Sequence, residues 1–210
     1  MIRRPRLSFS TRSFASLLLL AAIASSGAAG AAERTFTVGG ESKNSNITFE
    51  SESDFETILG HTNTAAGTVV ADLDAGTATI DVRVPVAALD TGIELRNKHL
   101  QSGDWLDARK NPEIRFVSRS ARKLDDGSWE ISGDFSLHGV THPVTVRAQV
   151  KAIPAAAAKA AGLGKGDWLR VSAPFEVKLS DHGVEVPGKL AGRVSDLWKV
   201  KLNLFVNANA

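Results

Sequence analysis

Apolar and polar residues alternate with a period of two along most of the chain after residue 33, in runs separated by glycine and aspartate. Such alternation is typical of β-strands with one face turned to a core and the other to water. The clearest run is 168–179, whose apolar face holds Leu169, Val171, Ala173, Phe175, Val177 and Leu179. Pro174 lies on the opposite face and has no N–H to donate, which predicts a strand edge or a bulge there. We therefore expect an all-β protein.

The same pattern predicts nine strands, at 35–38, 46–51, 67–72, 77–84, 113–120, 129–137, 144–151, 168–179 and within 194–206. Glycine following aspartate at 74–76 and at 125–128 predicts tight hairpin turns, because glycine tolerates the positive φ that these turns require. Consecutive strands are therefore expected to pair in an antiparallel manner.

Two segments depart from the alternation and predict one or two short helical connections. In 91–105, Thr91 could cap a short helix, and in the alanine-rich segment 154–163 Pro154 stands at a plausible first turn. Eight or nine strands with such long alternation favour a closed antiparallel barrel, because closure removes exposed strand edges. A β-sandwich is the alternative.

The first 32 residues have the organisation of a secretory signal peptide. Basic residues precede an apolar stretch from Phe14 to Ile23, and small residues follow it. The apolar stretch is about half of the roughly 20 residues that a transmembrane helix needs, so stable membrane insertion is not expected. We therefore predict a signal peptide at 1–32, export to the periplasm, and a single barrel domain at 33–210.

Charge and cysteine content narrow the classes of function further. The full chain has 25 basic and 23 acidic residues, but four of the basic ones precede Glu33. Removing those four leaves 21 (25 − 4) against 23, a net charge of −2, which disfavours a nucleic-acid-binding protein. The chain has no cysteine, so no disulfide is available to support the fold after export.

Motifs for catalysis are weak. The sequence contains no nucleophile elbow, phosphate-binding loop, dinucleotide fingerprint or zinc-protease helix. Ser180, Asp181 and His182 are the residue types of a catalytic triad, but triad members meet across a fold, and three consecutive residues are better interpreted as a turn. Asp104 and Asp107 flank an apolar pair, where a helix cap and a surface ion pair explain them as well as acid/base chemistry does.

Histidines are the remaining candidate metal ligands. Only His138 and His142 are close in sequence, and Gly139 between them indicates a turn and not a helix face. Hydrogen-bonded structural histidines are therefore favoured over a metal site. The sequence predicts neither a bound transition metal nor another cofactor.

Three segments carry a family resemblance. Residues 95–107, with the following 111–116, closely resemble the central signature of the YceI-like family of polyisoprenoid-binding periplasmic proteins. Residues 133–144 (GDFSLHGVTHPV) are similar to a second conserved stretch of that family, and 175–184 (FEVKLSDHGV) to a third. Their order and spacing agree over roughly 36–206.

The resemblance implies an eight-stranded, lipocalin-like antiparallel barrel whose apolar lumen holds a long isoprenoid lipid, such as a polyprenyl chain or a quinone tail. On that basis the expected ligand-binding residues are Phe49, Leu100, Trp105, Leu106, Ile114, Phe116, Ile131, Phe135, Leu137, Phe175, Val177, Leu202 and Leu204. His99, Asp104 and His138 are candidates for polar contacts with the ligand. Trp105 and Leu106 are candidate lid residues.

The residues alone leave other interpretations open. Eight strands enclose an interior that side chains either fill or leave wide enough for one ligand, and the apolar residues fit both cases. A binding protein without catalysis is the leading hypothesis. An enzyme or redox partner of a quinone-like lipid, with His99, Asp104 or His138 as acid or base, is a second. A structural barrel with a filled interior is a third, and the sequence leaves open a homodimer.

Overall fold

The computed structural model describes residues 33–39, 44–190 and 192–208, and these form an antiparallel β-structure. The predicted signal peptide, 1–32, lies outside the described residues. The strands are β1 (Arg34–Val38), β2 (Asn46–Glu52), β3 (Thr57–Thr62), β4 (Ala66–Asp72), β5 (Thr77–Pro85), β6 (Glu113–Lys123), β7 (Trp129–Leu137), β8 (Val140–Ile153), β9 (Asp167–Lys178) and β10 (Leu197–Ala208). Two α-helices, α1 (Glu94–Gln101) and α2 (Ala155–Ala160), and three 3-10 turns, η1 (Val86–Ala88), η2 (Leu179–His182) and η3 (Gly188–Leu190), lie between them.

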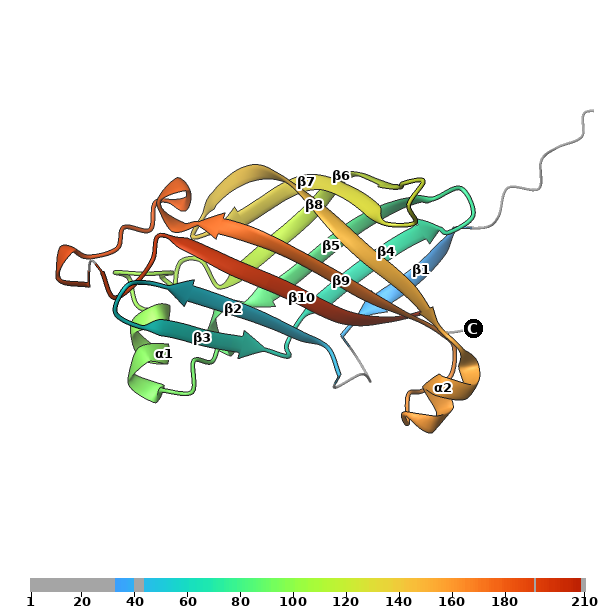
Figure 1. Cartoon of the computed structure of the whole chain (residues 1–210), viewed down its shortest axis with the longest axis horizontal. Helices are drawn as coiled ribbons and strands as arrows, with labels where there is room; N and C mark the ends of the chain where they lie inside the picture. The colour runs from blue at the N-terminus through green and yellow to red at the C-terminus, as the bar shows by residue number, and fades with distance from the viewer. Residues whose placement is uncertain (1–32, 40–43, 191, 209–210) are drawn as a thin grey trace, which may run out of the picture.

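The sheet closes on itself. Its order is β1-β4-β5-β6-β7-β8-β9-β10-β2-β3, and an additional pairing joins β1 to β10. The closed ring therefore contains eight strands, β1 and β4 to β10, and the hairpin of β2 and β3 extends the sheet beyond it (Figure 1). Both β1 and β2 use the same edge of β10, with β2 on residues 198–203 and β1 on Val206 and Asn207. The predicted eight-stranded barrel is confirmed, and the sandwich alternative is wrong.

All nine predicted strands are present, but β3 was not predicted. Its sequence, TILGHT, offers only Ile58 and Leu59 as large apolar residues, and these two lie on opposite faces. At the next inward position stands Gly60, where an added Cβ would lie 2.1 Å from the ring of Phe49. The Phe49 ring thus fills the place that a side chain of β3 would occupy, which removes the apolar signal from β3.

Both predicted helices are present with shifted starts. Thr91 does not cap α1, because Ile93 occupies the N-cap; the amide and hydroxyl of Thr91 instead donate to Asn97 Oδ1. Pro154 is the N-cap residue of α2 and not part of its first turn. Figure 1 places α1 at one end of the barrel beside the β2–β3 hairpin, and α2 at the opposite end.

Pro174 lies in the part of β9 that pairs with β10 only. The β8–β9 ladder ends at Ser172, whereas the β9–β10 ladder continues through Pro174 to Lys178. A residue without an N–H is tolerated there because no β8 strand lies opposite it. The edge that the sequence predicted is therefore local: β9 is interior to the sheet over its first half and unpaired on one side over its second half.

Candidate functional site

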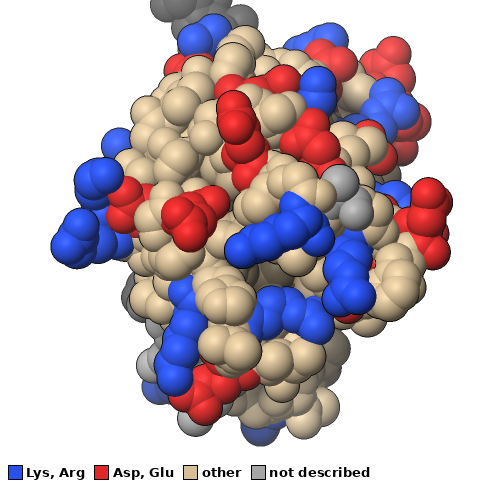
Figure 2. Space-filling view, turned by 90° about the vertical axis from the view of Figure 1, so that its left-hand side faces the viewer, with Lys and Arg blue, Asp and Glu red and all other residues tan. Residues whose placement is uncertain are grey.

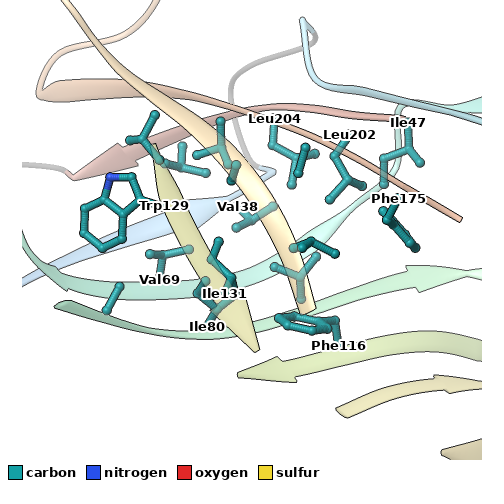
Figure 3. A pocket seen from close by; sticks show the side chains of 18 of the residues that line it. Val38, Ile47, Val69, Ile80, Phe116, Trp129, Ile131, Phe175, Leu202 and Leu204 are labelled. Carbon is teal, nitrogen blue, oxygen red and sulfur yellow. The ribbon is translucent and has the colours of Figure 1, made fainter. Parts of the chain in front are cut away.

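The barrel encloses an apolar cavity that its side chains leave unfilled. Its volume is about 140 Å³, and aliphatic and aromatic side chains from strands on all sides line it. The side chains labelled in Figure 3, among them Val38, Ile80, Phe116 and Leu204, converge on this space from opposite walls. A single water needs only about 10–15 Å³ of such space. The cavity is therefore far larger than the small voids left between packed side chains.

A second apolar cavity, of about 110 Å³, continues the first toward the α1 end. Six residues line both spaces and so mark their junction: Ile47, Val84, Ile114, Phe135, Phe175 and Leu202. At that junction the rings of Phe135 and Phe175 meet edge to face, with centroids 5.7 Å apart. We refer to these two adjoining spaces as the lumen.

Every apolar residue that the sequence analysis assigned to ligand binding lies on the lumen wall. The first cavity is lined by Ile114, Phe116, Ile131, Phe135, Phe175, Leu202 and Leu204, and the second by Phe49, Leu100, Trp105, Leu106, Leu137, Val177 and again Ile114, Phe135, Phe175 and Leu202. Residues of β4 and β5, including Val69, Ala71, Ile80 and Val82, line it as well. Sequence reasoning predicted those two strands but did not assign their inward faces.

The described wall of the lumen contains almost no ionisable side chains. Among the described lining residues, Arg115 is the only ionisable one. Its guanidinium is held on the outer face by Asp81, with Nε 3.0 Å from Oδ1 and Nη2 2.7 Å from Oδ2. No described histidine or carboxylate therefore faces the lumen as an acid or base.

The three predicted polar contacts lie elsewhere. His99 lines an outer groove at the α1 end of the barrel, and Asp104 is exposed in the loop after α1. His138 forms the turn between β7 and β8 together with Gly139, both with positive φ, and its ring bonds to a backbone carbonyl. None of the three reaches the lumen wall.

Asp107 pairs with Lys110 at 3.0 Å, and this contact lowers the pKa of the Asp107 carboxyl.

A seam opens in the barrel wall between β8 and β9. Residues 140–148 of β8 pair with β7 only, because the β8–β9 ladder covers just Gln149–Ile153 of β8. Val144 and Val146 of this part of β8 and Phe175 of β9 line the lumen, so the seam borders it. We call residues 140–148 of β8 and 173–178 of β9 the β8–β9 seam.

Three histidines bridge the end of the seam. His138 Nδ1 lies 3.2 Å from the carbonyl oxygen of His182, His142 Nε2 lies 2.8 Å from that of Asp181, and His182 Nδ1 lies 3.1 Å from that of Val140. Because a carbonyl oxygen only accepts, each of these ring nitrogens carries the hydrogen. The bridge joins the β7–β8 hairpin to η2, across a sequence separation of about 40 residues.

The same contacts determine what the sequence 180–182 does. Ser180 Oγ donates to Asp196 Oδ2 at 2.7 Å, and buried His182 donates to Val140, so these residues do not form a Ser–His–Asp relay. They form η2, in agreement with the turn interpretation. In the part of the chain that the structure describes, no group of three histidine or acidic side chains is placed to hold a metal ion.

Acidification is expected to destabilise the barrel through His182. Burial lowers the pKa of His182 below its ordinary value, and the neighbouring His142 acts in the same direction, whereas the Val140 carbonyl and Asp181 oppose them. Because the unfolded chain then binds a proton more readily, the contribution is present above about pH 6.5 and is lost as the pH falls below it. We expect the melting temperature to fall by a few degrees between pH 7 and pH 5.

The variant His182→Asn keeps a donor for the Val140 carbonyl but does not titrate, so its melting temperature should vary less over this interval. The matched control is His99→Asn, which removes an exposed histidine outside the seam. Carboxylates with lowered pKa values, such as Asp81 beside Arg115, titrate below this interval. Equal pH dependence in wild type and His182→Asn would contradict the assignment.

A groove of about 280 Å³ lies outside the lumen, at the α1 end of the barrel. It is lined by residues of α1, of the β2–β3 hairpin and of the segment 190–194. Leu100, Trp105 and Trp198 line both this groove and the second cavity, so these three side chains separate the lumen from the outside. Trp105 is thus placed as the sequence analysis expected of a lid residue, whereas Leu106 lines only the inner space.

A closed antiparallel barrel of eight strands around an apolar lumen, with a groove at one end, defines the lipocalin-like class of architecture. Within that class, the YceI-like domain model matches residues 40–206, and the chain belongs to the YceI-like family. In the described residues, no helix is long and apolar enough to cross a membrane.

Curated relatives are proteins named UPF0312. The one from Pseudomonas savastanoi pv. phaseolicola is 34% identical over 113 residues, which are 52% of this chain and 54% of the relative. The one from Vibrio vulnificus is 32% identical over 136 residues, covering 62% and 67%. The chain thus spans about half the length of the first of these relatives.

Solved structures share the fold at low sequence identity. BcnA from Burkholderia cenocepacia superposes with a TM-score of 0.65 at 20% identity, covering 77% of this chain and 95% of BcnA. The YceI protein of Campylobacter jejuni gives a TM-score of 0.64 at 18% identity, covering 76% and 90%. A polyisoprenoid-binding domain from Saccharophagus degradans gives 0.58 at 14% identity, covering 84% and 99%.

Proposed function

We propose that this protein binds a long isoprenoid lipid, a polyprenyl chain or a quinone tail, inside its lumen and carries or stores it without catalysis. The observation that carries the proposal is the lumen itself, which is apolar, unfilled by side chains and separated from an outer groove at one end only by Leu100, Trp105 and Trp198. A packed interior would leave no space for a ligand, and a lumen lined by acids and bases would favour an enzyme.

The energetics of such a site favour an apolar chain. Each CH₂ group that leaves water contributes about 0.8 kcal/mol, and empty apolar cavities of this kind stay dry and accept apolar ligands. The gain is reduced by the entropy lost when a flexible chain is ordered, so a large share of the chain must be buried for tight binding. The two adjoining cavities provide apolar walls against which such a chain is buried.

The choice of an isoprenoid over other apolar chains is supported by family membership and by the polyisoprenoid-binding domain from Saccharophagus degradans, which has the same fold. The periplasmic location rests on the signal-peptide pattern of residues 1–32. A carrier in that compartment would shield an isoprenoid chain from water between membrane-bound steps.

Lipid extraction tests the proposal. The chain, expressed with residues 1–32 and recovered from the periplasmic fraction, should release an isoprenoid lipid into organic solvent in near-stoichiometric amount, as measured by mass spectrometry. The intact mass of the same preparation should correspond to a start near Glu33. A preparation without any apolar ligand that also fails to take up added polyprenol would contradict the binding function.

A further inference from the structure

Large apolar side chains that remain exposed are concentrated at the open end of the barrel. In the described residues, Phe55 is 66% exposed, Ile93 48% and Leu95 63%. Phe55 lies in the turn between β2 and β3, whereas Ile93 and Leu95 lie at the start of α1. We call these three side chains the apolar rim. Leu59, on the outer side of β3, is 62% exposed and Leu197, at the start of β10, is 44% exposed. Leu59 does not line the groove and offers a comparison.

The three rim residues surround one opening. Ile93 and Leu95 line the outer groove together with Arg193. The Arg193 guanidinium lies 4.3 Å from the ring centroid of Phe55, and the Phe55 amide donates to the Gly192 carbonyl at 3.3 Å. The rim is therefore held in place by the segment 192–194, although its side chains face solvent.

Cationic groups accompany the rim. Arg96 and Arg193 both line the groove, and Figure 2, which looks onto this end, shows Lys and Arg side chains bordering a hollow near the centre of the view. The contact between Arg96 and Glu56 is long, 3.9 Å, so the Arg96 guanidinium keeps free donors. Lys98 on the same helix is instead paired with Glu94 at 2.6 Å and does not line the groove.

We propose that the apolar rim and its two arginines dock the open end of the barrel on a lipid bilayer. The inference rests on the proposed function, because an isoprenoid lipid resides in a membrane and passes to a carrier with the least exposure to water if the opening touches the bilayer. Aromatic and aliphatic side chains insert at the level of the head groups, and arginines beside them contact lipid phosphates.

The position of the groove makes the bilayer a better match than a protein partner. Leu100, Trp105 and Trp198 separate the groove from the lumen, so the rim surrounds the route by which a lipid would enter. A rim that is apolar, faces solvent and encloses this route fits the boundary between head groups and acyl chains.

Vesicle binding tests the proposal. The described barrel begins at Arg34, so the chain from Glu33 onward is used. Without residues 1–32, the apolar N-terminal segment cannot itself bind the vesicles. Sedimentation is measured with vesicles of phosphatidylcholine, alone and mixed with phosphatidylglycerol, that contain the polyprenol solanesol. We expect the double variant Phe55→Ser, Leu95→Ser to lose about tenfold or more in vesicle affinity and to take up solanesol correspondingly more slowly. The amount of solanesol retained at equilibrium should be unchanged.

The control is Leu59→Ser, which removes an equally exposed leucine and should behave as wild type. Replacing Arg96 and Arg193 by glutamine should weaken binding mainly to the vesicles with phosphatidylglycerol, and Lys98→Gln should not. Absence of vesicle binding by the wild type, or equal losses in Leu59→Ser and the rim variant, would overturn the docking surface. Vesicle binding without any solanesol uptake would instead contradict the proposed function.

Discussion

Phe175→Trp is expected to remove most of the bound isoprenoid while leaving a folded barrel. Phe175 lies at the junction of the two cavities, where its ring packs edge to face on Phe135. A larger ring at this point extends into open space and divides the lumen, so the ligand loses the continuous burial that stabilises it. Because the cavity has room for the added atoms, the free energy of unfolding should change by less than about 1 kcal/mol.

The measurement combines lipid content by mass spectrometry with thermal melting. Phe135→Trp, on a different strand at the same junction, should give the same result. Agreement between the two variants would show that the effect does not depend on which face of one strand is taken to point inward. Lys178→Trp places the same ring on the outer face of β9 and should leave lipid content unchanged. If both inward variants melt far below the wild type and the wild type carries no ligand, the interior is a packed core and the binding function is wrong.

Gly133→Ala is expected to cause a large loss of stability through a single added methyl group. Gly133 faces inward on β7, and a Cβ added there would lie 2.4 Å from the carbonyl oxygen of Val117 and 2.6 Å from Phe116 Cζ. The oxygen belongs to the backbone of the neighbouring strand, so a rotamer change does not relieve this clash. We expect the free energy of unfolding to fall by about 2–3 kcal/mol, within the range known for overpacking.

Chemical denaturation of wild type and variant gives this difference directly. Ser132→Ala, one residue earlier on the outer face, is the control and should change stability only slightly, since it removes an exposed contact with Thr145. A Gly133→Ala protein as stable as the wild type would show that β6 and β7 separate more easily than the register Ser118↔Gly133 implies.

Strands with their own apolar alternation were predicted from the sequence, and the exception is instructive. In β7 every second residue from Trp129 to Leu137 is buried, and this periodicity is visible in the sequence. In β3 the inward position of Gly60 is covered by the Phe49 ring of β2, so the apolar group belongs to a neighbour in space. Local periodicity does not detect a strand whose buried surface is supplied by another strand.

The candidate site was also predicted from the sequence only in part. Lumen residues such as Phe116, Ile131 and Phe175 follow from alternation because a closed barrel turns one face of every strand inward. Whether the lumen is filled depends on how all strands pack together, which no single segment encodes. The histidine bridge of the seam was also out of reach, because His142 and His182 bond to main-chain carbonyls of distant segments, and a carbonyl has no sequence signature.

The position of β10 has a consequence for the order of folding. This strand, the tenth along the chain, pairs with β9 over its whole length and with both β1 and β2 on its other edge. During synthesis β1 and β2 can pair early with β4 and β3, but about 150 further residues must be made before β10 exists. Contacts of such sequence separation form slowly. Until Leu197–Ala208 has docked, the barrel is an open sheet with unpaired edges, the form of the chain most exposed to aggregation.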